Sequence, residues 1–175
     1  MLTEAVETGY DFRALVRQHK ATVFSIALHF LRDRATAEEV AQEVFFSLHR
    51  NLHQIETPAH AAAWLRKVAV QRSIDEGRRR SRRPQVALAD APEPAASIRP
   101  GDPLLSELLR KLVATLPEAP RMVMVLRYQE DLEPAEIAAA LEMPVATVKS
   151  HLQRSLALLR EKLARRGIGE SGWTG

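Results

Sequence analysis

Apolar residues recur every three or four positions along most of the 175-residue chain, which is the spacing of one face of an α-helix. The clearest stripe runs from Ala37 to Leu48, with Asp33 as a cap before it. Thr57 followed by Pro58 has the form of another helix start, because proline fits the first helical position. The first part of the chain is expected to hold three helical segments: residues 11–31 with a break near His19 and Lys20, residues 34–48, and residues 58–83.

Prolines mark the expected helix starts in the second part of the chain. Four helices are predicted there: Pro103 to Leu116, Pro117 to about Tyr128, Pro134 to Leu141, and Pro144 to about Arg165. Glu133 and Met143 precede the last two prolines and are poor N-cap residues, so those two helix starts are expected to be loosely defined.

Five of the ten prolines lie in residues 84–103, a stretch with neither helical nor strand periodicity. We expect a flexible linker there, between a first domain at residues 10–83 and a second at residues 104–166. Aromatic residues make up only 5% of the chain and glycines number seven, which argues against a strand-rich fold. The sequence therefore predicts an all-α protein of two small helical domains.

Composition narrows the class of protein further. The longest apolar run has five residues, far below the ~20 of a membrane span, so no membrane insertion is expected. The chain has no cysteine, which excludes disulfides and thiol chemistry. His49 and His53 are spaced like metal ligands on a helix but have no evident third ligand, and no phosphate-binding loop or catalytic motif occurs. No metal, no cofactor and no enzymatic activity are expected.

The net charge of +3 is unevenly distributed. Residues 77–83 hold five arginines and no acidic residue, and residues 144–166 carry a net charge of +5. Two basic segments on a slightly acidic chain fit a protein with two nucleic-acid contacts, although two solvated helix ends explain the charge equally well.

The second basic segment coincides with a predicted helix-turn-helix. Ile137, Ala138 and Leu141 share one face of a short helix, and Val145, Val148 and Leu152 share one face of the next helix, with a tight turn between them. An ordinary helical hairpin is the alternative. The outward face of the second helix carries groups that reach base edges and phosphates in a major groove: Thr147, Lys149, Ser150, His151, Gln153 and Arg154.

Two further surfaces stand out in the first domain. Opposite the apolar stripe of residues 37–48 lies a set of acidic and amide groups with one aromatic, typical either of a docking face for a basic groove or of a solvated face. Its members are Glu38, Glu39, Gln42, Glu43 and Phe46. On the third helix, Arg72, Arg79 and Arg83 form one rough stripe and Arg78 and Arg82 a second, suited to a row of phosphates. Trp64 on this helix is expected to be a core residue.

Three segments, in this order, resemble bacterial sigma factors of the extracytoplasmic-function (ECF) type. Residues 37–45 (AEEVAQEVF) resemble the segment that docks on core RNA polymerase. Residues 63–69 (AWLRKVA), followed by Asp75 and Arg78, resemble the helix that recognises the minus-ten element. Residues 116–152, with LP, LRY, EIA and TVKSHL, resemble the domain that reads the minus-thirty-five element. The resemblance covers about residues 10–165.

The resemblance assigns further site residues. Asn51, His53 and Gln54, in the loop 51–57, would hold a base flipped out of the non-template strand. Lys67, Gln71 and Arg72 would join Arg78, Arg79 and Arg82 at the minus-ten element, and Arg127 would join the minus-thirty-five contacts. Two residues depart from the family pattern: Gln71, where asparagine is common, and Glu142, where many members have glycine in the turn. If residue 142 has positive φ, a side chain there costs ~1–2 kcal/mol.

The function implied is a cytoplasmic transcription initiation factor that binds core RNA polymerase and promoter DNA, both as duplex and as non-template single strand. An anti-sigma factor is an expected further partner. Two alternatives are a stand-alone helix-turn-helix regulator and a sigma-mimicking adaptor that binds an anti-sigma factor and no DNA. The start of the chain, Met-Leu-Thr-Glu, lacks the character of a signal peptide, in keeping with the cytoplasm.

Overall fold

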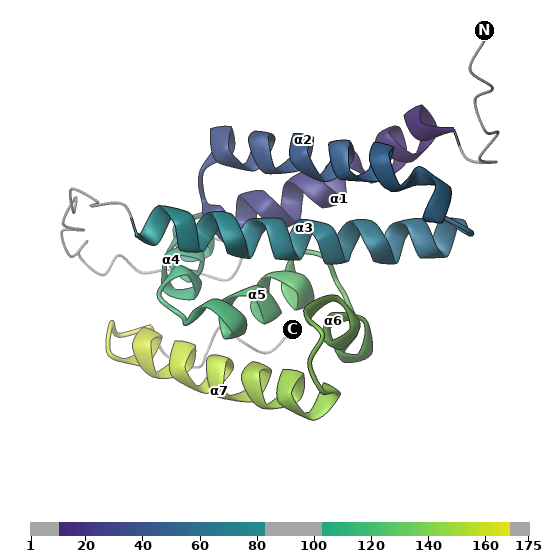
Figure 1. The fold of residues 1–175 in the computed structure, drawn as a ribbon. Coiled ribbons are helices and arrows are strands. Elements are labelled where there is room, and N and C mark those ends of the chain that lie inside the picture. The colour runs from purple at the N-terminus through teal and green to yellow at the C-terminus, as the bar shows by residue number, and fades with distance from the viewer. Residues whose placement is uncertain (1–10, 83–102, 169–175) are drawn as a thin grey trace, which may run out of the picture. The chain divides into compact units, whose positions relative to one another are not determined.

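The computed structural model describes residues 11–82 and 103–168, and all regular elements within these ranges are helical (Figure 1). They form two compact units. The first carries α1, α2 and α3 as far as Arg78, and the second carries α4, α5, α7 and most of α6. The predicted all-α fold with two helical domains is confirmed. The predicted linker, and Arg83 with it, lies outside the described residues.

In the first unit, α1 (Phe12–Leu31) and α2 (Arg34–Asn51) pack against each other. The predicted break near His19 is wrong: α1 is continuous from Phe12 to Leu31, because the polar side chains of His19 and Lys20 do not interrupt the backbone hydrogen bonds. The expected cap at Asp33 is confirmed, since its Oδ1 accepts hydrogen bonds from the N–H of Thr36 at 2.8 Å and from the hydroxyl of Thr36 at 2.6 Å.

A 3₁₀ turn, η1 (Leu52–Gln54), and a short connection lead from α2 to α3 (Pro58–Ser81). Thr57 caps α3 as expected, because its hydroxyl accepts from the N–H of His60 at 3.0 Å. Three of the five buried residues of α3 are small: Ala61, Ala69 and Ser73. At Gly77 an added Cβ would lie 3.1 Å from the ring of Phe30, so the absence of a side chain lets α3 approach α1 closely.

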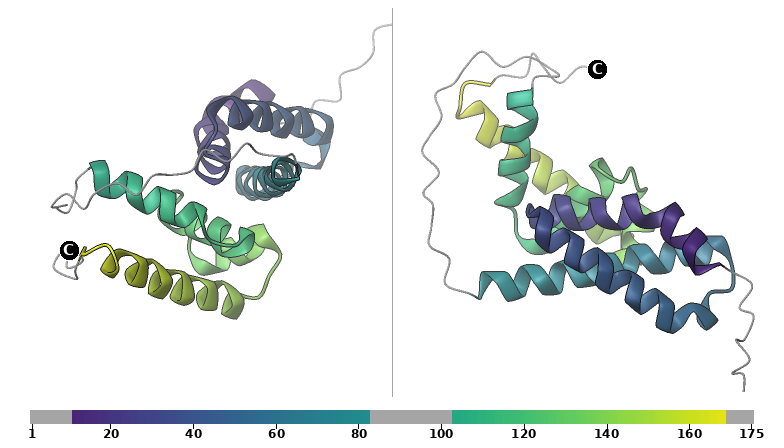
Figure 2. Two further views of the ribbon diagram at one scale, coloured as in Figure 1. Left: turned by 90° about the vertical axis from the view of Figure 1, so that its left-hand side faces the viewer. Right: turned by 90° about the horizontal axis from the view of Figure 1, so that it is seen from above.

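The second unit consists of α4 (Pro103–Ala114), α5 (Glu118–Tyr128), α6 (Pro134–Leu141) and α7 (Val145–Ala164). Helix α7 packs against α5 and α4 (Figure 2). The shared core contains leucines from α4 and α7 and one methionine from α5: Leu112, Leu159, Leu163 and Met124, with Leu116 from the turn after α4.

The expectation of a poorly capped start for α6 is wrong. The carboxylate of Glu136 accepts a hydrogen bond from the N–H of Glu133 at 3.0 Å, in a capping box that defines the first turn. At α5 and α7 the prolines Pro117 and Pro144 occupy the cap position, so both helices begin one residue later than predicted.

Candidate functional site

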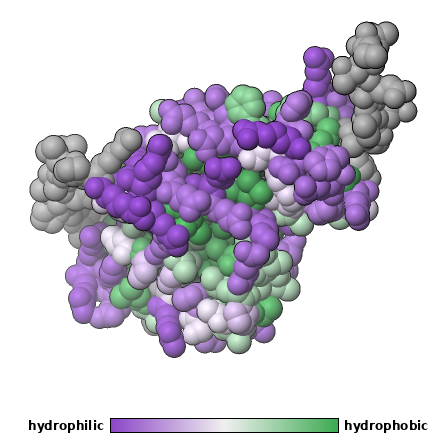
Figure 3. Space-filling view, in the orientation of Figure 1, coloured by the Kyte–Doolittle hydropathy of each residue, from purple (hydrophilic) through white to green (hydrophobic). Residues whose placement is uncertain are grey.

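The outward face of α2 has the composition that the sequence predicted. Val40, Val44 and Leu48 are buried, whereas the five polar and aromatic residues opposite them are exposed. Phe46 stands out, with 65% of its surface exposed. We call this set the docking face; it comprises Glu38, Glu39, Gln42, Glu43 and Phe46. The surface over α2 and α3 in Figure 3 is largely hydrophilic, so an exposed phenylalanine there is a local exception.

Two carboxylates of the docking face have partners within the chain. Glu38 accepts from Arg34, one turn earlier on α2, at 3.0 Å. Glu43 forms an ion pair with Arg72 of α3, with 3.8 Å between Nη1 and Oε2. Sequence reasoning missed this second pair, because the two residues are far apart in the sequence and no helical periodicity connects them.

The predicted minus-ten residues on α3 do not form one cluster. Arg78, Arg79 and Arg82 are exposed near the C-terminal end of the helix, and Gln71 is exposed earlier. Lys67 is half-buried. Arg72 is turned toward α2, where its Nη2 donates to the hydroxyl of Ser47 at 3.4 Å.

The loop expected at residues 51–57 is more ordered than the sequence suggested. Its first part is the 3₁₀ turn η1, and Ile55 is buried beneath it. The amide of Asn51 is engaged at both ends: Nδ2 donates to the carbonyl of Ser47 at 2.8 Å, and Oδ1 accepts from Gln54 at 3.3 Å. His53 is exposed beside them. The three predicted residues therefore form a small preorganised polar group.

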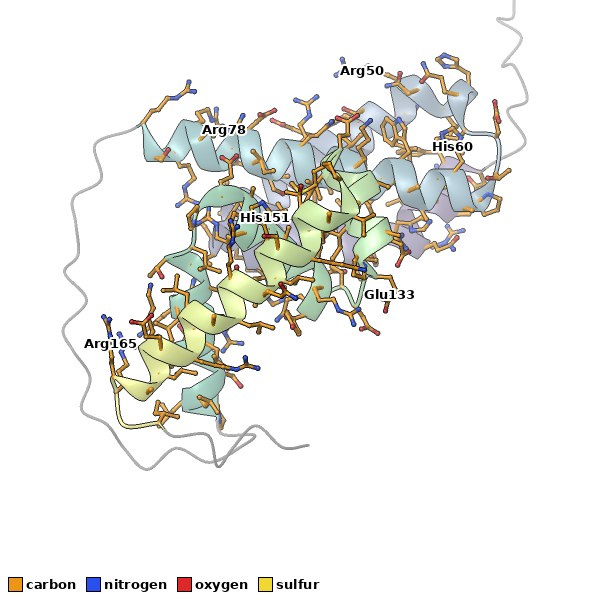
Figure 4. The ribbon with its side chains drawn as sticks, turned by 90° about the horizontal axis from the view of Figure 1, so that it is seen from below. Arg50, His60, Arg78, Glu133, His151 and Arg165 are labelled. Carbon is orange, nitrogen blue, oxygen red and sulfur yellow. The ribbon has the colours of Figure 1, made fainter. Side chains whose placement is uncertain are left out.

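This polar group and the arginines lie at opposite ends of α3. In Figure 4, His60 marks the N-terminal end of the helix and Arg78 the C-terminal end. With a rise of 1.5 Å per residue, the eighteen steps from His60 to Arg78 span roughly 27 Å, most of the ~34 Å length of one turn of duplex DNA.

Helices α6 and α7 form the predicted helix-turn-helix. Glu142 ends α6 in the left-handed region at φ 53° and ψ 43°, as the turn requires. The N–H of Met143 then donates to the carbonyl of Ala138 at 3.1 Å. Ala138 is buried, with 7% of its surface exposed.

The outward face of α7, which we call the recognition face after its expected role, is largely as predicted. Lys149, Gln153 and Arg154 are exposed, while Thr147, Ser150 and His151 are partly exposed. The opposite side is buried at Val148, Ser155, Leu159 and Leu163. The placement of Val145 on the core face is wrong: it is 39% exposed, because it is the first residue of the helix and lies beyond the packed region.

Arg127, expected among the DNA contacts, is held within the second unit. Its Nη1 donates to the carbonyl of Leu132 and to the carboxylate of Glu133, both at 3.0 Å. The arginine thereby ties the end of α5 to the start of α6. Arg121, earlier on α5, is half-buried, and burial lowers the pKa of its guanidinium.

Two histidines of the first unit, His49 and His19, contact or lie near other side chains of the fold. The ring of His49 meets that of Phe12 edge to face, with 5.2 Å between centroids. His19 has a lowered pKa because of burial and, secondarily, the charge of Arg66. Trp64, expected in the core, is half-buried.

Across residues 11–82 and 103–168, no three histidine or acidic side chains gather in a way that would hold a metal ion. No helix in the same ranges is long and apolar enough to cross a bilayer.

Comparison with known families matches both units. Residues 15–83 match "Sigma-70 region 2", and residues 106–159 match "Sigma-70, region 4". The ECF RNA polymerase sigma-E factor of Escherichia coli is 30% identical over 93% of this chain and 93% of its own length. The RNA polymerase sigma-E factor of Streptomyces coelicolor is 31% identical over 90% of this chain and 89% of its own length. The chain spans 38% of another relative, a probable sigma factor RfaY from Xanthomonas campestris.

Among solved structures, the sigma factor RpoE of Bartonella quintana, in complex with the anti-sigma factor NepR, has a similar fold. The TM-score is 0.68 at 20% identity, covering 88% of this chain and 97% of that chain. The predicted family resemblance is confirmed: the chain belongs to the sigma-70 family and is a transcription initiation sigma factor of the ECF type.

Proposed function

We propose that the docking face of α2 binds core RNA polymerase, and that α3 and α7 contact the minus-ten and minus-thirty-five elements of the promoter. The observation that carries the docking role is Phe46, 65% exposed among acidic and amide side chains. An aromatic side chain with this exposure gains free energy when a partner covers it, and the surrounding acidic groups favour a basic groove.

The minus-ten contact is divided between the ends of α3. We assign phosphate contacts to Arg78, Arg79 and Arg82, because an exposed arginine row neutralises the backbone without reading sequence. We assign an unpaired non-template base to the polar group of Asn51, His53 and Gln54. Lys67 and Gln71 lie between the two ends.

The minus-thirty-five contact is assigned to the recognition face of α7. Its first three turns carry hydroxyl, amide, imidazole and basic groups on one side of a helix that the core holds firmly on the other. Arg127 supports this face by tying α5 to the start of α6, in addition to the DNA contact that the resemblance implies.

This function requires no covalent chemistry of the chain itself, since the polymerase supplies the catalytic magnesium. We place its action in the cytoplasm, with the polymerase. An anti-sigma factor is a further proposed partner, in line with the complex in which the structurally similar RpoE was solved.

Reconstitution with purified core polymerase tests the proposal. We expect a stable complex on gel filtration and transcripts that start at specific promoters only when the chain is present. A chain that bound duplex DNA as a dimer without polymerase would instead be a stand-alone regulator. A chain that bound an anti-sigma factor but neither polymerase nor DNA would be an adaptor.

A further inference from the structure

Arg72 connects two surfaces that the proposed function assigns to different partners. It lies on α3, two helical turns before Arg79 and on the same rough stripe, yet its guanidinium is turned toward α2. Nη1 lies 3.8 Å from the carboxylate of Glu43, and Nη2 donates to the hydroxyl of Ser47 at 3.4 Å. Glu43 belongs to the docking face. One ion pair therefore joins the docking face to the helix assigned to the minus-ten element.

The ion pair between Arg72 and Glu43 is exposed to solvent, so either side chain can exchange its partner for another charged group. The side chain of Arg72 is 47% exposed and that of Glu43 is 60% exposed. Exposed ion pairs of this kind change the equilibrium constant of the state that they stabilise by a factor of only about two to five. A cation that approaches Glu43 more closely, with more of the solvent removed, would displace the guanidinium of Arg72.

Docking of a basic groove would create that competition. A cationic side chain of the partner would be attracted to the carboxylate of Glu43. The positive charge of Arg72, next to that carboxylate, repels the incoming cation. Once displaced, the guanidinium remains on the stripe of α3 that also carries Arg79. There, a promoter phosphate is an alternative partner for its positive charge.

We propose that Arg72 is shared between the two surfaces: it pairs with Glu43 in the unbound chain, leaves that carboxylate when polymerase docks, and then contacts a promoter phosphate. The inference rests on the proposed docking role of α2. Because such coupling is reciprocal, polymerase strengthens the promoter contact by the same factor by which promoter DNA strengthens docking.

The first test measures the affinity of core polymerase for the chain without DNA. Arg72→Gln removes the competing cation, so we expect binding to become about two to five times tighter. The matched control is Arg17→Gln on α1, because Arg17 forms an equally long pair, at 3.8 Å from Asp11, with similarly exposed side chains. We expect the control to leave the affinity unchanged. Weaker docking of Arg72→Gln would show that Arg72 only orients Glu43, and would overturn the proposal.

The second test measures promoter binding by the assembled holoenzyme across a range of salt concentrations. We expect Arg72→Gln to lower the slope of log K against log salt by about one, as the loss of one phosphate contact does. Arg79→Gln, two helical turns further along the same stripe, serves as the comparison for a phosphate contact. An unchanged slope for Arg72→Gln would overturn the transfer to DNA.

The proposed function and this inference fail differently. If Gln42→Lys and Phe46→Ala leave polymerase binding unchanged, the docking face itself is misassigned. If those variants weaken docking while Arg72→Gln changes neither affinity nor salt slope, only the sharing of Arg72 is wrong.

Discussion

At the scale of single residues, Glu142 combines a side chain with a backbone conformation that favours glycine. Its φ of 53° lies in the left-handed region, where a Cβ costs roughly 1–2 kcal/mol. Part of this cost is offset because glycine has more conformational freedom in the unfolded chain. The turn of the helix-turn-helix therefore contains local strain that a substitution can relieve.

We expect Glu142→Gly to be more stable than Glu142→Ala by about 1 kcal/mol in urea unfolding. The two variants lose the same carboxylate, so their difference isolates the effect of the Cβ at this φ. Equal stabilities would mean that the turn relaxes to another conformation when the side chain is shortened.

His19 makes stability depend on pH. Its pKa is lowered from 6.5 by burial first and by the charge of Arg66 second, so the folded chain binds this proton less readily than the unfolded chain. Stability is therefore full above the unfolded pKa and falls as the pH drops below about 6.5.

We expect His19→Gln to reduce the loss of unfolding free energy between pH 7.0 and pH 5.0. Urea unfolding at the two pH values measures it, and His53→Gln, an exposed histidine in the same unit, is the control. A pH dependence in His19→Gln as steep as that of the unaltered chain would contradict the assignment.

At the scale of elements, helix positions followed from local patterns. The stripe after Asp33 depends on neighbours three or four residues apart, and the start of α6 is marked by its first residue, Pro134; a sequence displays both directly. The outward direction of the docking face follows from the same periodicity, because the residues opposite a buried stripe must face solvent or a partner.

Other features depend on contacts that periodicity does not encode. The pairing of Arg72 with Glu43 joins two helices whose crossing is set by packing, and the hold of Arg127 on Leu132 depends on the path of a turn. Glu133 was misjudged because N-cap preferences rank single residue types, whereas its helix start is defined together with Glu136.

The docking face provides a prediction at this scale. We expect Glu39→Lys and Gln42→Lys each to weaken core-polymerase binding, because each places a cation where a basic groove is proposed to bind. Both residues are exposed, so the change in folding free energy is expected to stay within about 0.5 kcal/mol.

Affinity for core polymerase, measured with circular dichroism as a check on the fold, tests this prediction. Gln18→Lys on α1 is the matched control, since it makes the same substitution at another exposed position of the first unit. Native helicity with unchanged affinity in both docking-face variants would exclude α2 as the contact.

At the scale of the whole molecule, the two surfaces proposed to contact DNA, at the end of α3 and on α7, differ in character. The exposed arginines at the end of α3 form a dense row, which suits contacts along a phosphate backbone. The recognition face of α7 combines hydroxyl, imidazole and guanidinium groups on the second helix of a helix-turn-helix. This combination suits hydrogen bonds to the edges of bases. Positioning is therefore expected at the end of α3, and base readout at α7.

Substitutions in the two surfaces should have different signatures. We expect Arg79→Ala or Arg82→Ala to weaken binding to all promoters about equally and to lower the salt slope by about one. Where Ser150, His151 or Arg154 reads a base, its replacement by alanine should instead cost ~1–3 kcal/mol of binding free energy at one base pair of the upstream element. The preference for that base should also relax.

Holoenzyme binding to a panel of single-base promoter variants, at several salt concentrations, distinguishes the two signatures. Arg17→Ala, an exposed arginine on α1 outside both surfaces, controls for the loss of one positive charge. If alanine at all three α7 positions lowers affinity uniformly across the panel, α7 is not the reader. Specificity would then have to come from the first unit, where the amide and imidazole groups of Asn51, His53 and Gln54 are the side chains best suited to recognise a base.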